Sequence, residues 1–201
     1  GVIQHGQYQS EYLKTQIKAR GLVDPTGLGR IYRVVHETTK RDARPALSGK
    51  TPAELVATLS HPNGWWRDTA QQLIILKQDK SVVPALKTMA QASKNQLARI
   101  HALWTLDGLL AADAPLVREL MKDADPRIRV QAIRASESIY KATPGDKTLA
   151  NDYRAMIKDA DPDVVIQAML TLKLMRVPQY ADLVRATREA STSRGVKEIG
   201  Q

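Results

Sequence analysis

A four-residue pattern that ends in alanine recurs through most of the chain at nearly constant spacing. The copies are Arg67-Asp68-Thr69-Ala70, Arg99-Ile100-His101-Ala102, Arg129-Val130-Gln131-Ala132 and Val165-Ile166-Gln167-Ala168. Successive copies lie 32, 30 and 36 residues apart. Such spacings are typical of helical repeat proteins, in which each helix pair buries its apolar face only by stacking on its neighbours. The pattern therefore predicts an all-α, right-handed solenoid of about four to five helix pairs.

In two of the repeats, the second helix is preceded by the same five-residue sequence. Lys122-Asp123-Ala124-Asp125-Pro126 and Lys158-Asp159-Ala160-Asp161-Pro162 are identical over five residues. Asp125 and Asp161 can accept hydrogen bonds from the first free backbone amides of a helix. The proline that follows each stands where a missing N–H costs nothing. These sequences predict second helices that begin at 126 and 162.

The helix pairs can be assigned from these starts and from the apolar periodicity. The expected pairs are 52–60 with 64–78, 81–92 with 94–110, 113–122 with 126–141, 148–158 with 162–175, and a fifth, incomplete unit from 178–190. Alanine at 70, 102, 132 and 168 would let neighbouring helices approach closely. We expect the layer between them to be filled by Leu73, Leu106, Ile133, Ile139 and Leu172. The repeat domain is thus expected over 51–201.

The first fifty residues do not follow the repeat. Residues 7–20 have the spacing of an amphipathic helix, and 30–35 have the composition of a short strand with no partner in this chain. Residues 37–50 resemble a linker. The chain begins without methionine or a signal-peptide pattern. We interpret it as part of a larger protein, with 1–36 as the tail of a preceding domain.

Charge and cysteine content narrow the function classes. The net charge is +9, but residues 1–50 carry nine Lys/Arg against four acids, and 51–201 carry twenty-one against seventeen. A solenoid that holds a phosphate backbone should show excess positive charge in its repeats. The absence of cysteine excludes disulfides, thiolate nucleophiles and covalent c-type haem attachment within these residues. No apolar run approaches the roughly 20 residues of a membrane span.

Several segments resemble one bacterial family. They are 2–5, 12–17, 29–33, 193–200 and above all His61-Pro62-Asn63-Gly64-Trp65-Trp66-Arg67-Asp68-Thr69-Ala70. They are similar to membrane-bound-dehydrogenase-type proteins, in which a sugar-dehydrogenase-like β-propeller is followed by HEAT repeats and often by cytochrome c. The resemblance implies that 1–36 close a propeller and that 51–201 form a HEAT segment. It also implies a periplasmic or otherwise extracytoplasmic location, with pyrroloquinoline quinone and haem c held by other parts of the parent protein.

Candidate metal and catalytic residues are better explained structurally. The histidines at 5, 36, 61 and 101 lack paired-ligand spacing. Asp159, Asp161 and Asp163 imitate the opening of a calcium loop, but Val164 replaces the required glycine and Leu170 the required glutamate. We therefore predict no catalytic, cofactor-binding or metal-binding residue in this chain.

Tryptophan and the recurring arginines form the candidate interaction surface: Trp65, Trp66, Arg67, Arg99 and Arg129. Exposed tryptophan can anchor a protein partner. Consecutive helical residues point about 100° apart, so we expect one of the two adjacent tryptophans to be buried. We expect the pair to seal the first repeat against the N-terminal segment, with local ion pairs at Arg67 and Asp68, and Trp104 to lie in the core.

Two function classes follow. The first is a non-catalytic scaffold or docking solenoid, part of a larger quinone- or haem-linked dehydrogenase-like protein, whose partners are neighbouring domains or another protein. The alternative is a nucleic-acid-binding or DNA-repair HEAT-like solenoid, in which Trp65, Trp66 and Asp68 would lie beside DNA. The balanced charge of the repeats favours the first.

Overall fold

The computed structural model describes residues 6–22, 30–40 and 44–199. The chain divides into two compact units, Gly1–Arg44 and Pro45–Gln201, and each is described by itself. No helix among the described residues has the length and apolar character needed to cross a membrane.

The N-terminal unit contains one α-helix in its described residues. A 3-10 turn, η1 (Gly6–Tyr8), precedes α1 (Glu11–Ala19), and the Ser10 side chain caps α1 by accepting from the backbone N–H of Leu13 at 3.3 Å. The predicted helix is confirmed, but the predicted strand at 30–35 is wrong. These residues form no regular element, and Ile31 and Val34 are almost fully exposed. A strand requires a neighbour for its N–H and C=O groups, and the described part of the chain supplies none.

The second unit is a series of helix pairs, preceded by the 3-10 turn η2 (Leu47–Gly49). In the described residues the pairs are α2 (Pro52–Thr58) with α3 (Gly64–Lys77), α4 (Val83–Ala92) with α5 (Gln96–Gly108), α6 (Ala114–Leu120) with α7 (Pro126–Ala142), α8 (Lys147–Met156) with α9 (Pro162–Leu174), and α10 (Tyr180–Ala190) with α11 (Arg194–Glu198). A 3-10 turn, η3 (Lys80–Val82), leads into α4. The predicted pairs are confirmed within a few residues at their ends.

Side-chain caps set the start of most helices. Asp125 Oδ1 accepts from the backbone N–H of Arg127 at 2.9 Å, and Asp161 Oδ1 accepts from that of Asp163 at 2.9 Å. Asparagine performs the same task before α3 and α5. Because each cap satisfies backbone donors that the helix leaves unpaired, the capping prediction made from the aspartate–proline sequences is confirmed.

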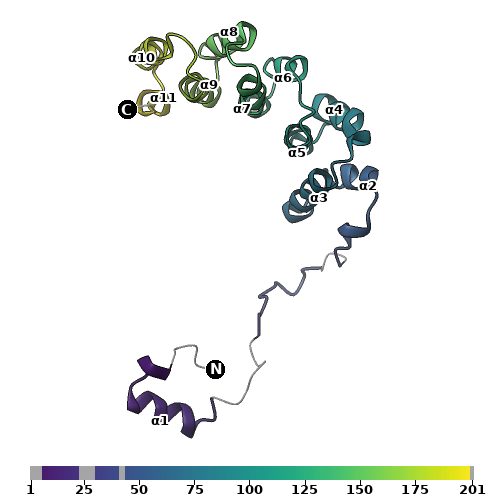
Figure 1. Ribbon diagram of the computed structural model, residues 1–201, viewed down its shortest axis with the longest axis vertical. Coiled ribbons are helices and arrows are strands. Elements are labelled where there is room, and N and C mark those ends of the chain that lie inside the picture. Colours follow the sequence, from purple (N-terminus) through teal and green to yellow (C-terminus); the bar gives the residue numbers. More distant parts are fainter. Residues whose placement is uncertain (1–5, 23–29, 41–43, 200–201) are drawn as a thin grey trace. The chain divides into compact units, whose positions relative to one another are not determined.

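The helices form two rows in a curved, solenoid-like stack. The helices α3, α5, α7, α9 and α11 form one series, which we call the inner row, and each contacts its neighbours in that series. Each also packs against the helix that precedes it in the chain. Within this unit the inner row follows the inside of the curve (Figure 1). The four repeated alanines, at 70, 102, 132 and 168, are completely buried, which permits close helix approach. The fold of the described residues is thus all-α.

The core is a continuous apolar layer between the two rows. Leu106, Ile133 and Leu172 are fully buried, and Leu73 and Ile139 are partly buried against the same layer. At the C-terminal end the layer divides, and a separate cluster forms from Val165, Met169 and Val196. This division affects the last pair of helices, as described below.

Candidate functional site

Two of the three recurring arginines form an arginine–aspartate ladder with Asp123 and Asp159. The Arg99 guanidinium pairs with the Asp123 carboxylate through Nη1 and Nη2. One repeat later, Arg129 Nε and Nη2 donate to Asp159 Oδ2 and Oδ1 at 2.9 and 2.7 Å, while its Nη1 donates to the carbonyl of Asp123 at 2.8 Å. Each arginine therefore ties its own repeat to the acid of the next repeat.

Burial and hydrogen bonding together set the pKa values of the two aspartates in the ladder. The Arg129 and Asp159 side chains are only 15% and 9% exposed. Burial opposes ionisation of Asp159, but the hydrogen bonds from Arg129 and from the Asp161 N–H outweigh it and lower its pKa. Burial likewise opposes ionisation of Asp123, and hydrogen bonds from Arg99 and from the backbone, with the charges of Arg99 and Arg129, lower its pKa. Both carboxylates are ionised at neutral pH.

The ladder changes at both ends of the repeat series. The acid stands six residues before the arginine of its own repeat, and the corresponding positions in the first, second and fifth repeats are His61, Ser93 and Ser191. Arg67 has no aspartate at the corresponding position of the next repeat. Its Nη1 donates to the carbonyls of His61 and Pro62, at 2.7 and 2.8 Å, just as Arg129 Nη1 donates to those of Asp123 and Ala124. In the fourth repeat, Val165 replaces the arginine. Among the described residues, the ladder contact between successive repeats is therefore missing at both ends of the series.

The adjacent tryptophans lie at the start of α3, where Trp65 is 53% exposed and Trp66 is partly buried. The Trp66 ring stacks on His61 with centroids 4.7 Å apart, and Trp65 meets Trp66 edge-on at 6.3 Å. The expectation that one of the two would be buried is met only in part, because Trp66 is partly buried against the core and Trp65 is exposed. A contact of either with the N-terminal segment stays a prediction.

The predicted local ion pairs of Arg67 and Asp68 are wrong: neither residue pairs with a nearby opposite charge in its own helix among the described residues. Arg67 binds carbonyl oxygens, and Asp68 Oδ1 lies 3.9 Å from His101 Nε2. Burial lowers the pKa of His101, and the positive charge of Arg67 lowers it further. The negative charge of Asp68 raises the pKa but does not offset these two effects. The His101 ring is therefore neutral at pH 7, and its Nδ1 lies 2.7 Å from Gln71 Oε1.

Polar side chains link neighbouring helices of the inner row elsewhere. Trp104, expected in the core, is only partly buried, and its Nε1 donates to Gln131 Oε1 of α7 at 2.8 Å. Glu137 of α7 accepts from the Thr171 hydroxyl of α9 at 2.6 Å. These hydrogen bonds link successive helices of the inner row and engage its partly buried polar groups.

A hollow of about 640 Å³ lies on the inner row between α7 and α9. We call it the inner groove; its lining residues are Arg134, Glu137, Gln167, Leu170, Lys173, Leu174 and Arg176. Leu170 and Leu174 are 41% and 60% exposed and lie one helical turn apart. The structure places three cationic side chains around these leucines, and in the described part of the chain none of the three makes a hydrogen bond or ion pair.

The inner groove includes none of the five residues predicted from the sequence to form an interaction surface. Arg99 and Arg129 have an internal role in the ladder, and Trp65 lies in the first repeat; their role in binding stays a prediction. The signal that could have indicated the groove is the spacing of Leu170 and Leu174, apolar residues four apart beside cations. That signal is weak because the same spacing occurs in any buried helix face.

Among the described residues, no group of three or more histidine, aspartate or glutamate side chains is arranged to hold a metal ion. Asp159 is engaged by Arg129, and Asp161 caps α9. His5 lies outside the described residues. No protein-family model matches the chain, and no curated protein matches it.

Proposed function

We propose that this chain is a non-catalytic docking solenoid whose inner groove binds an acidic, leucine-containing segment of a neighbouring domain or partner protein. The observation that carries the proposal is the combination of two exposed leucines with three unpaired cations around one hollow.

The chemistry of the groove favours this class of partner. Apolar contact with Leu170 and Leu174 would supply affinity. Carboxylates on the partner would pair with Arg134, Lys173 and Arg176, which raises the association rate and sets orientation. The one acid in the groove, Glu137, is held by hydrogen bonds from Thr171 and Gln167. The free charge presented to a partner is therefore positive.

The parent protein is a further part of the proposal. The resemblance around residues 61–70 favours a quinone- or haem-linked dehydrogenase-like protein outside the cytoplasm. In it the solenoid would join a propeller to an electron-accepting domain. This attribution rests on the sequence resemblance, whereas the docking proposal rests on the groove.

A labelled amphipathic peptide of leucine and glutamate, with leucines four residues apart, tests the docking proposal by fluorescence anisotropy. Binding should weaken at high salt. The double variant Leu170→Ser/Leu174→Ser should lose at least about tenfold in affinity, because burial of one leucine contributes about 1.5–3 kcal/mol. Leu76→Ser is the matched control, since Leu76 is 78% exposed at the same repeat position as Leu174.

Equal losses in the control and in the groove variant would refute the groove as the binding site, as would absence of binding at low salt. The non-catalytic part has a separate test. Quinone-dependent oxidation of sugars or alcohols is measured with the isolated chain, and turnover by this chain would overturn it.

A further inference from the structure

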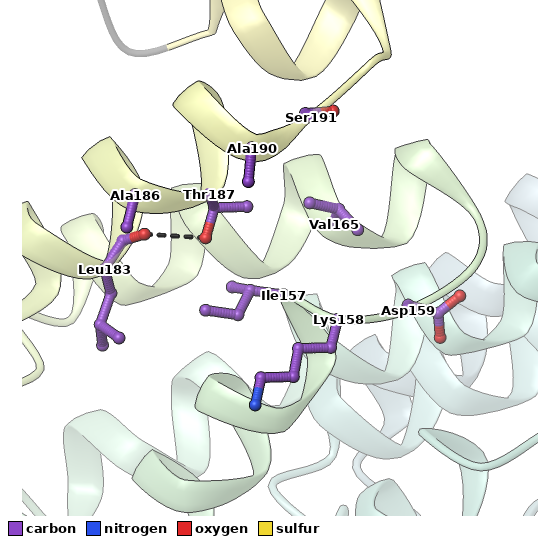
Figure 2. A pocket seen from close by; sticks show the side chains of 9 residues that line it. All are labelled: Ile157, Lys158, Asp159, Val165, Leu183, Ala186, Thr187, Ala190 and Ser191. Atoms are coloured by element: carbon purple, nitrogen blue, oxygen red, sulfur yellow. Dashed lines mark hydrogen bonds between the residues drawn. The ribbon is translucent and has the colours of Figure 1, made fainter.

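A second hollow, of about 460 Å³, lies between the end of α8, α9 and α10. We call it the terminal cleft. Figure 2 shows Ala186, Thr187 and Ala190 of α10 on one side and Ile157 and Lys158 on the other. Most of its lining is aliphatic, from Ile157, Val165, Leu183, Ala186 and Ala190.

The terminal cleft lies where the arginine–aspartate ladder ends. In the preceding repeat, Arg129 spans from the carbonyl of Asp123 to the carboxylate of Asp159 and so links two successive repeats. The corresponding residues at the cleft are Val165 and Ser191, both of which line it. A valine and a serine cannot form the ion pair that Arg129 and Asp159 make. The apolar core also divides here, because Val165 belongs to the separate C-terminal cluster.

The polar groups at the terminal cleft are already engaged, with one exception. The Thr187 hydroxyl donates to the Leu183 carbonyl at 2.8 Å, and Ser191 Oγ accepts from the Ser193 N–H at 3.1 Å (Figure 2 draws the first of these). The Asp159 carboxylate is paired with Arg129. The ammonium group of Lys158 is exposed and makes no hydrogen bond or ion pair within the described residues. The cleft thus offers aliphatic walls and one free positive charge.

We infer that the terminal cleft binds a single aliphatic chain with a carboxylate head, as in a medium-chain fatty acid. The chain would lie between α10 and the Ile157 side of the cleft, where it removes apolar surface from water. The carboxylate would pair with the Lys158 ammonium at the edge. This site is separate from the inner groove, and the inference does not depend on the docking proposal.

Methyl NMR of the full chain, titrated with hexanoate, octanoate and decanoate below their micelle concentrations, tests the inference. The methyl signals of Ile157, Val165 and Leu183 should shift on titration. Affinity should rise about fourfold for each methylene that enters the cleft. Decyltrimethylammonium, which has the same tail and the opposite charge, should bind more weakly than decanoate.

Variants distinguish the terminal cleft from nonspecific adsorption. Val165→Arg/Ser191→Asp rebuilds the ladder contact across the cleft and should weaken decanoate binding at least tenfold. Ala190→Leu, which fills the space without adding charge, should weaken it in the same direction. Lys158→Glu should reverse the preference between decanoate and decyltrimethylammonium, whereas Lys173→Glu, the same charge change in the inner groove, should leave it unaltered.

The inference would be overturned if decanoate shifted methyl signals throughout the chain without favouring the cleft. Unchanged affinity in both cleft-filling variants would also overturn it, provided that their circular dichroism is native. An equal effect of Lys158→Glu and Lys173→Glu would attribute the preference to overall charge and not to the cleft.

Discussion

Replacing Arg129 with methionine is expected to destabilise the helix stack by about 3–5 kcal/mol, because it leaves a mostly buried carboxylate without its counter-ion. In the native fold, Arg129 donates two hydrogen bonds to Asp159, at 2.9 and 2.7 Å, and a third to the Asp123 carbonyl at 2.8 Å. After the substitution, the Asp159 carboxylate, 9% exposed, would keep the hydrogen bond from the Asp161 N–H. Methionine replaces much of the aliphatic stem, so the loss reports the ion pair more than the packing.

Urea unfolding followed by far-ultraviolet circular dichroism measures this effect. For a domain of this size the denaturant slope is about 2 kcal/mol per molar urea, so a loss of 3 kcal/mol would lower the midpoint by about 1.5 M. The increment should shrink when Asp159 is protonated. Because its pKa is lowered in the fold, the stabilisation is present above the unfolded pKa of about 3.8 and is lost as the pH falls through the folded pKa.

The chain itself provides the control. Val165 and Ser191 replace the arginine and the aspartate at the last repeat junction, so Arg129→Val/Asp159→Ser copies a pair that this fold accommodates. Although it removes more atoms, the double variant should cost less than Arg129→Met, because no charge is left buried alone. A cost below about 1 kcal/mol for Arg129→Met, or a double variant as damaging as the sum of its parts, would refute the reasoning.

Three further predictions concern other parts of the solenoid. Burial and the charge of Arg67 lower the pKa of His101 below 6.5, so the unfolded chain binds the proton more readily than the folded chain. Stability should therefore fall as the pH drops through about 6.5. In His101→Gln, the urea midpoint should depend less on pH between about pH 7 and pH 5. A Cβ at Gly108 would lie 2.5 Å from Ile75 Cδ1, so Gly108→Ala should lower the free energy of unfolding by about 1–3 kcal/mol. Adding Ile75→Ala to Gly108→Ala should recover part of that loss. If the losses of the two single variants simply add in the double variant, the clash is refuted. Duplex DNA should bind only weakly at physiological salt, because residues 51–201 carry nearly balanced charge. Tight binding under that condition, lost steeply as the salt concentration rises, would favour the nucleic-acid alternative.

The amino-acid sequence determined most of the helical architecture. The period of the alanine-ending pattern and the aspartate–proline starts located the helix pairs, because capping and apolar periodicity are local properties that a single chain segment carries by itself. The same local reasoning failed at residues 30–35. Strand propensity is local, but a strand also needs a partner, and the described residues contain none.

Tertiary structure decided which side chains are available for binding. The recurrence of Arg99 and Arg129 suggested an interaction surface, yet their partners, Asp123 and Asp159, lie 24 and 30 residues away in sequence. Stacking of consecutive repeats brings these pairs together and buries them. The same stacking leaves Leu170 and Leu174 exposed beside free cations, and it leaves a cleft where Val165 and Ser191 replace the arginine–aspartate pair. Exposure and cavities depend on contacts between distant segments, and so only the packed helices reveal them.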